Sequence, residues 1–174
     1  MTTLCRTFLY VFLYVIAVAF FVPLLPQPVF AACTDPPAPD VNWQRCRMDG
    51  LDLVGVDLSG ARLRDVSFFR SNLSAAKLSE VSGYRAKFVN AELAGAVLDG
   101  GGFEGADFTK ANLTDASLVG ADLRRARLYR TLLRGADLTG ARLRDADLAS
   151  ADLSGATWTD GKHVCAENSI GRCN

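Results

Sequence analysis

The chain has 174 residues, the length of one ordinary domain, and its 19 Lys and Arg residues balance 19 Asp and Glu residues. A neutral surface has no net attraction for nucleic acid or anionic lipid, so we expect no nucleic-acid partner. The single histidine, His163, argues against a catalytic triad or a His-based zinc site, and the sequence has no nucleotide-binding or hydrolase motif. Composition therefore favours a protein without enzymatic activity, cofactor or metal.

Residues 1–32 have the composition of a secretory signal peptide. Arg6 is their only charged residue, residues 8–22 are apolar, and Ala31 and Ala32 supply the small side chains of a cleavage site. We expect a hydrophobic signal helix that is removed after one of these alanines, and an exported protein in the periplasm or outside the cell. The alternatives are an uncleaved membrane anchor and a lipid attached to Cys33. We expect membrane contact only through such an N-terminus.

The four cysteines that follow the leader are Cys33, Cys46, Cys165 and Cys173. An even number in an exported chain indicates two disulfides. Three pairings are possible, and proximity in the sequence favours Cys33 with Cys46 and Cys165 with Cys173. Residues 33–40 are proline-rich, which excludes a helix interior or a central strand. We expect them to form an extended lead-in that the first disulfide fastens.

Residues 41–160 repeat with a period of five. The centres of these five-residue units, or pentads, run from Trp43 to Trp158 in 24 units, and every centre except Gly83 is large and apolar. The residue two places before the centre is small or apolar, so both point inward, whereas the residue between them is mostly polar and points outward. The fifth position is often glycine, which supplies the positive φ of a type II turn. Because this period fits neither a helix nor a simple strand, each pentad must turn a corner.

This A-[D/N]-L-x-x pattern resembles the pentapeptide-repeat family over about residues 41–160. The resemblance implies an all-β fold, a right-handed quadrilateral β-helix in which four pentads form one coil of 20 residues. The 24 pentads would then make about six coils. Residues 161–174 resemble the ends of exported members of the family. We expect a disulfide-bounded C-terminal cap there, because the open end of a solenoid exposes unpaired strand edges.

Residues 20 apart are therefore expected to stack. One column predicts an internal aromatic stack of Phe68, Phe88 and Phe108. An outward column predicts Arg–Asp pairs between coils, and its members are Arg45, Asp65, Arg85, Gly105, Arg125 and Asp145. Gly83 leaves a gap, which Phe103, one coil later and close to Gly101, is expected to fill. A bulge that turns Tyr84 inward is the alternative.

One outward stripe has the composition that is favoured at protein interfaces. It consists of Phe69, Val89 and Tyr129, with Arg70, Lys110 and Arg130 beside them. We expect this stripe to bind a protein partner of unknown identity. The chain itself is expected to be a monomer or an end-to-end dimer.

The sequence thus predicts a non-enzymatic, exported solenoid that serves as a structural or protein-binding scaffold. The alternative is a DNA mimic that protects topoisomerase, which the family resemblance implies for some members. That role requires a strongly negative rod in the cytoplasm. Without the leader, this chain has 18 Lys and Arg against 19 Asp and Glu, and the leader itself indicates export.

Overall fold

The computed structural model describes residues 33–174, so the predicted signal helix and its cleavage site lie outside the described residues. The chain divides into two units, residues 1–30 and residues 31–174, and the solenoid belongs to the second. Within residues 33–174 the β-structure consists of isolated bridges, with no longer strand and no helix. No helix in that part of the chain is long and apolar enough to cross a membrane.

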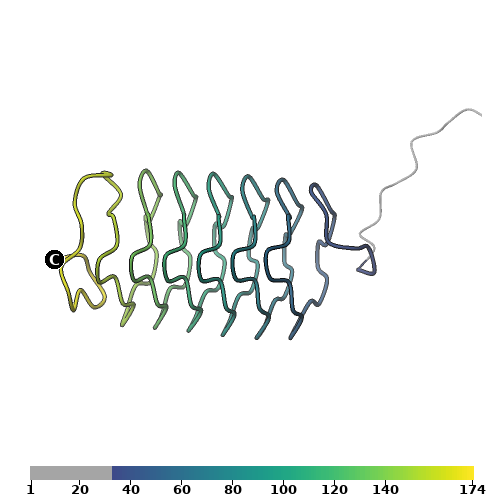
Figure 1. Cartoon of the computed structure of the whole chain (residues 1–174), viewed down its shortest axis with the longest axis horizontal. Coiled ribbons are helices and arrows are strands. Elements are labelled where there is room, and N and C mark those ends of the chain that lie inside the picture. The colour runs from purple at the N-terminus through teal and green to yellow at the C-terminus, as the bar shows by residue number, and fades with distance from the viewer. Residues whose placement is uncertain (1–32) are drawn as a thin grey trace, which may run out of the picture. The chain divides into compact units, whose positions relative to one another are not determined.

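Parallel β-bridges join residues that lie 20 positions apart, from the bridge between Asn42 and Arg62 to the bridge between Asp137 and Thr157. Each bridge therefore connects a pentad to the fourth pentad after it, and the chain winds in coils that stack in a row (Figure 1). This arrangement confirms the predicted repeat solenoid.

Four columns of pentads run along the solenoid, and each is named after the centre of its first pentad. They are the Trp43, Met48, Leu53 and Leu58 columns. Because bridged pentads lie 20 residues apart, the Trp43 column contains residues 41–45, 61–65 and so on, and the Met48 column follows it at 46–50 and 66–70. Alternate blocks of ten residues thus belong to the same two neighbouring columns.

Each backbone N–H group has a fixed role in the pentad. In the pentad centred on Leu113, the N–H of Asn112 donates to the carbonyl of Ala91 in the preceding coil (2.9 Å), and the N–H of Leu113 donates to Leu132 in the next coil (2.7 Å). The N–H of the fifth position also bonds to the next coil. The N–H two places before the centre closes the turn from the preceding pentad. Four of the five donors are thereby satisfied, as a buried backbone requires.

The remaining donor, the N–H that follows the centre residue, is often bound by a side chain. In nine pentads an Asp or Asn just before the centre accepts this hydrogen bond. Asn112 accepts from Thr114 at 3.1 Å and Asp137 accepts from Thr139 at 2.9 Å. This is an Asx turn, in which the short side chain imitates a backbone acceptor. It explains why the outward position of the repeat favours Asp and Asn.

Every fifth residue from position 40 to position 155 has a positive φ. The ten glycines at this position have φ between 64° and 72°, as the predicted turn requires, but the other fourteen residues also have φ between 55° and 62°. Glycine is therefore favoured and not required. The hydrogen bonds on both sides of the turn hold the left-handed conformation, which costs a residue with a Cβ on the order of 1–3 kcal/mol.

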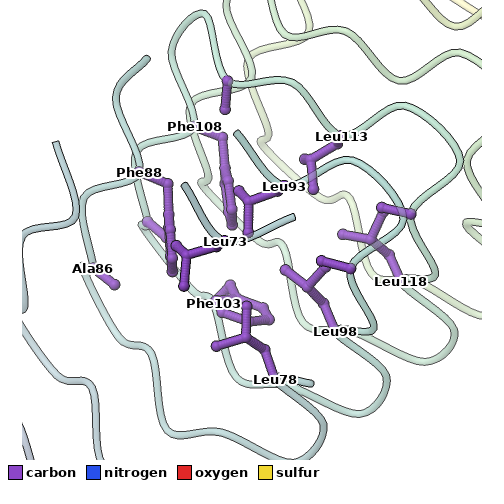
Figure 2. Packing of buried hydrophobic residues seen from close by; sticks show 14 of the residues in the cluster. Leu73, Leu78, Ala86, Phe88, Leu93, Leu98, Phe103, Phe108, Leu113 and Leu118 are labelled. Atoms are coloured by element: carbon purple, nitrogen blue, oxygen red, sulfur yellow. The ribbon is translucent and has the colours of Figure 1, made fainter. Parts of the chain in front are cut away.

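The Met48 column contains the predicted aromatic stack. The ring centres of Phe68 and Phe88 lie 5.4 Å apart and those of Phe88 and Phe108 lie 4.8 Å apart, with the ring planes within 18° of parallel. All three rings are fully buried, and Figure 2 shows Phe88 and Phe108 among the leucines of the neighbouring columns. The stack confirms that pentads 20 residues apart lie directly above one another.

Phe103 fills the space that Gly83 leaves in the Trp43 column. Its ring meets the rings of Phe88 and Phe108 edge-on, at centre distances of 6.0 and 5.7 Å. A Cβ atom on Gly83 would lie 2.8 Å from Cδ1 of Phe103, and one on Gly101 would lie 2.3 Å from Cε2. Both glycines therefore make room for this ring, as predicted.

The alternative, a bulge at Gly83 that turns Tyr84 inward, is wrong. The bridge between Ser82 and Gly102 keeps the spacing of 20, so no extra residue enters the coil. Tyr84 stays exposed, and its ring lies 5.1 Å from the guanidinium carbon of Arg64.

The N-terminal lead-in covers the first pentad. Cys33 and Cys46 form a disulfide with their Cα atoms 5.4 Å apart, and the indole N–H of Trp43 donates to the carbonyl of Asp35 (3.2 Å). The lead-in does not cover the Leu53 column, so Leu51, which occupies an inward position, is 41% exposed. The inward assignment is therefore wrong for Leu51, because no coil precedes it.

The C-terminal tail pairs with the last coil. Cys165 and Cys173 form the second disulfide. Two antiparallel bridges attach the tail to the last pentads of the Leu53 and Leu58 columns, and these bridges join Asp152 with Ile170 and Thr157 with Val164. The final centres of the other two columns, Leu143 and Leu148, are only partly buried, and so is Trp158, the final centre of the Leu58 column. The tail therefore forms bridges with two of the four columns and leaves the end of the core partly open.

We predict that Gly101→Ala lowers the free energy of unfolding by about 1–3 kcal/mol, because the new Cβ would overlap the ring of Phe103. Gly102→Ala is the matched control, since its Cβ would lie 3.6 Å from the carbonyl oxygen of Val81. Urea denaturation measures both variants. The effect of Gly101→Ala should shrink when Phe103→Leu is also present. Equal losses in the two alanine variants would contradict this packing.

Candidate functional site

The candidate functional site of this solenoid is a surface, because the inward positions are occupied by stacked side chains. Across residues 33–174, no three His, Cys, Asp or Glu side chains gather as a metal site requires. His163 is exposed in the tail, where its backbone N–H donates to Asp160 (2.9 Å). An open depression near the C-terminal end is lined by Arg124, Arg142, Leu143 and Arg144.

The predicted interface residues form one line at the corner between the Met48 and Leu53 columns. This line, the aromatic stripe, consists of Phe69, Val89 and Tyr129, with Arg70, Lys110 and Arg130 next to them in the turns. The guanidinium carbon of Arg70 lies 4.8 Å from the ring centre of Phe69, and that of Arg130 lies 5.1 Å from the ring of Tyr129. Phe69 is 37% exposed, while Val89 and Tyr129 are half-buried. The structure therefore brings the predicted residues together and adds two cation–π contacts.

Leu132, which was not predicted from the sequence, extends the aromatic stripe. It is the outward residue of a pentad in the Leu53 column, where most pentads have a polar residue, and it is 42% exposed. It follows Tyr129 by three residues in the same coil. A leucine at an outward position was the signal in the sequence.

The charges of the solenoid are sorted by column. The Trp43 and Met48 columns, which are residues 41–50 and every second block of ten up to 141–150, contain fourteen Lys and Arg and seven Asp and Glu, a net charge of +7. The Leu53 and Leu58 columns, in the blocks between these and up to 151–160, contain two cations and nine acids, a net charge of −7. We call these two faces the cationic half and the anionic half. The near-zero net charge of the whole chain therefore does not predict the charge of either half.

Only one of the predicted Arg–Asp pairs between coils forms. Asp65 and Arg85 lie 3.7 Å apart. Arg125 pairs with Glu104 instead (3.2 Å), and Arg45 has no acidic partner within 4.0 Å in the part of the chain that the structure describes. The prediction of a regular ladder is wrong because a long, solvated Arg side chain reaches acids in several neighbouring turns, and no exposed pairing is strongly preferred.

Asp122 is the centre of the densest charge network on the cationic half. Its carboxylate lies 2.7 Å from Nη2 of Arg124 and 3.6 Å from Nη2 of Arg142, and Arg124 also reaches Glu104 (3.1 Å). The side-chain hydrogen bond from Arg124, supported by the charges of both arginines, lowers the pKa of Asp122 although partial burial opposes this. The same hydrogen bond raises the pKa of Arg124.

The sequence profile described as pentapeptide repeats matches the chain in eight copies, over residues 39–65, 67–101, 86–125 and 126–157. These matches cover more than half of the chain and coincide with the bridged pentads. The chain belongs to the pentapeptide-repeat family. A comparison of this pentapeptide-repeat protein with curated proteins found no match.

Solved structures that resemble this pentapeptide-repeat protein include three members of the same family. HetL from the cyanobacterium Nostoc, a protein involved in the regulation of heterocyst differentiation, is 28% identical over 71% of this chain and 64% of HetL, with a TM-score of 0.31. Rfr23 from the cyanobacterium Cyanothece is 25% identical over 67% of this chain and 90% of its own, with a TM-score of 0.32. A protein of the Arabidopsis thaliana thylakoid lumen is 26% identical over 70% and 83% of the two chains, with a TM-score of 0.34. This chain thus spans less than two thirds of the length of HetL.

The lowered pKa of Asp122 predicts a pH-dependent contribution to stability. The ionised carboxylate stabilises the fold above its unfolded pKa of 3.8, and this contribution is lost as the pH falls through the lower folded pKa. We expect the difference in unfolding free energy between about pH 7 and about pH 2.5 to be smaller in Asp122→Asn than in the wild type. If Asp122→Asn and the wild type show the same difference, the network does not hold the carboxylate as described.

Proposed function

We propose that this protein is a non-enzymatic, exported scaffold that binds another protein through its outer surface. The observation that carries the proposal is the aromatic stripe, in which an exposed and a half-buried ring lie in one line with guanidinium groups on a hydrogen-bonded framework. Aromatic and Arg side chains supply most of the binding energy at protein interfaces. Because the ladder fixes the spacing of the stripe before a partner arrives, little conformational entropy is lost on binding.

The geometry of the repeat supports a binding role over catalysis. An active site needs polar groups that converge on one reacting atom. In a solenoid, the inward side chains pack against one another, and the outward side chains of different columns point away from one another. Those of one column meet only their neighbours above and below, as in the network around Asp122. Members of the pentapeptide-repeat family are generally structural or binding proteins.

The 20-residue bridges support a finer description of the fold. Four pentads per coil give a square cross-section, so we infer a right-handed quadrilateral β-helix. The 24 pentads between residues 41 and 160 would make about six coils. Residues 33–40 would act as the N-terminal lead-in and residues 161–174 as the C-terminal cap.

The two cysteine pairs support export. The Cα atoms of Cys33 and Cys46 lie 5.4 Å apart, and those of Cys165 and Cys173 lie 4.9 Å apart. Disulfides persist in oxidising compartments, such as the periplasm and the extracellular space. We therefore place the protein in one of these, with any membrane attachment confined to a retained or lipidated N-terminus.

The alternative role, DNA mimicry that protects topoisomerase, is not favoured. A protein that imitates a duplex presents acidic groups along the surface that its target recognises. Here the cationic half, with fourteen Lys and Arg, occupies two of the four columns. Export would also separate the protein from a cytoplasmic topoisomerase.

The proposal is tested with a variant that removes the rings of the stripe, Phe69→Ser with Tyr129→Ser. We expect affinity capture from the envelope fraction of the producing cell to retain a partner with the wild type and to lose it at least about tenfold with this variant, as for interface hot spots. Val119→Ser is the matched control, because Val119 is as exposed as Phe69 but lies in the Leu58 column. If the ring-deleted variant is folded and captures the same proteins, the stripe is not the binding site.

A further inference from the structure

We propose that the partner of the aromatic stripe is a second copy of this chain, bound side by side as a symmetric, parallel dimer. The inference rests on the proposed function, because it names the partner of the same surface. It depends on where the stripe lies relative to the two charged halves.

The aromatic stripe follows the boundary between the cationic and anionic halves. On one side of it, the outward residues of the Met48 column are Arg47, Ser67, Lys87, Asp107, Arg127 and Asp147. On the other side, the outward residues of the Leu53 column contain no cation, and they are Asp52, Asn72, Glu92, Asn112, Leu132 and Asp152. The stripe, with its own cations Arg70, Lys110 and Arg130, is thus flanked by a column with an outward net charge of +1 on one side and by a column with an outward net charge of −3 on the other.

This arrangement is self-complementary under one kind of symmetry. A two-fold axis parallel to the solenoid places the stripe of one copy against the stripe of the other, and it exchanges the flanks. The positive flank of each copy then faces the negative flank of its neighbour, and the interface is closed and isologous. A two-fold axis across the solenoid would place like charges opposite each other, so the charges select the parallel arrangement.

The parallel axis also fixes the register, because it leaves each coil at the same height. Arg47 then faces Asp52 of the second copy, and Lys87 faces Glu92 of the second copy, with each pair formed twice. Neither acid has an ion pair in the part of the chain that the structure describes, and Lys87 has none either. Arg47 lies 3.5 Å from Asp49 of its own chain, and Glu92 accepts a hydrogen bond from Asn112 (2.8 Å). In the last coil Asp147 would face Asp152, an acid that is already neutralised by Arg134.

The apolar residues of the stripe meet near the centre of the proposed interface. Phe69 and Leu132 are among the most exposed large apolar residues of the described chain, and the parallel axis brings each into contact with the stripe of the second copy. Burying these side chains supplies the attraction. The exposed ion pairs are individually weak, and they determine orientation and partner choice.

A second copy of this chain would contact both the cationic and the anionic half, whereas a partner with charge of one sign would contact only one of them. A polyanion would use the cationic half only, and a basic protein would use the anionic half only. The near-zero net charge also means that two copies do not repel each other at long range. These observations favour self-association over a different macromolecule.

Charge exchange across the interface is the decisive test, with the full chain isolated from an exporting host and studied by sedimentation equilibrium. Lys87→Glu and Glu92→Lys should each weaken the dimer at least about tenfold, because each places like charges opposite each other. A mixture of the two variants should restore dimers, since opposite charges meet again in the mixed pair. Arg62→Glu, which makes the same charge change in the Trp43 column, should leave the dimer intact.

A cysteine at the stripe reports the register. In the parallel dimer residue 109 of one copy lies opposite residue 109 of the other, so Thr109→Cys should cross-link to itself on mild oxidation, whereas Arg62→Cys should not. The four cysteines of residues 33–174 are already paired. A dimer that keeps its affinity in both single charge variants and fails to cross-link at residue 109 would overturn the proposal.

The outcomes also separate this inference from the proposed function. A wild-type chain that stays monomeric, while its stripe still captures a different envelope protein, would refute the dimer and leave the proposed function standing. If the variant with Phe69→Ser and Tyr129→Ser still captures the same proteins and still self-associates, both the dimer and the proposed function are refuted.

Discussion

The hydrogen bonds between coils are the constraint on which the rest of the structure depends. The N–H of Asn112 bonds to the coil behind it and the N–H of Leu113 bonds to the coil ahead, and the same pattern recurs along the solenoid. A pentad therefore cannot shift by one residue without exchanging its inward and outward side chains. The framework is strong enough to hold fourteen residues other than glycine at positive φ. Asp and Asn complete it by binding the one backbone donor that the ladder leaves free.

The same constraint limits the core. Side chains of one column stack at the spacing of neighbouring strands, about 4.8 Å, so a large residue must be matched by its neighbours above and below. Phe68, Phe88 and Phe108 satisfy this by lying nearly parallel. Phe103 satisfies it differently, since two glycines vacate the space that its ring occupies. Changes of volume in this core must therefore be compensated within the same or an adjacent coil.

Most of the fold could be predicted from the sequence because backbone bonds make inward positions periodic. The period of five, the Phe stack and the fit of Phe103 against Gly83 all follow from that rule. Predictions failed where the ladder does not act. Leu51 is exposed because no coil precedes it. Arg125 pairs with Glu104 because an exposed side chain can adopt several conformations and reach several acids. That the residues of the stripe lie in one line could be predicted from their 20-residue spacing. The contacts between its rings and guanidinium groups depend on side-chain conformations, which the repeat period does not determine.

The two charged halves were missed for a different reason, since net charge sums over faces that point in opposite directions. Sorting the sequence into alternate blocks of ten would have revealed them once the coil was known to have 20 residues. This property follows from the repeat itself. An outward substitution alters one column at one height and leaves the ladder intact, so the surface can be patterned column by column. A side-by-side contact uses that pattern along the whole length of the solenoid.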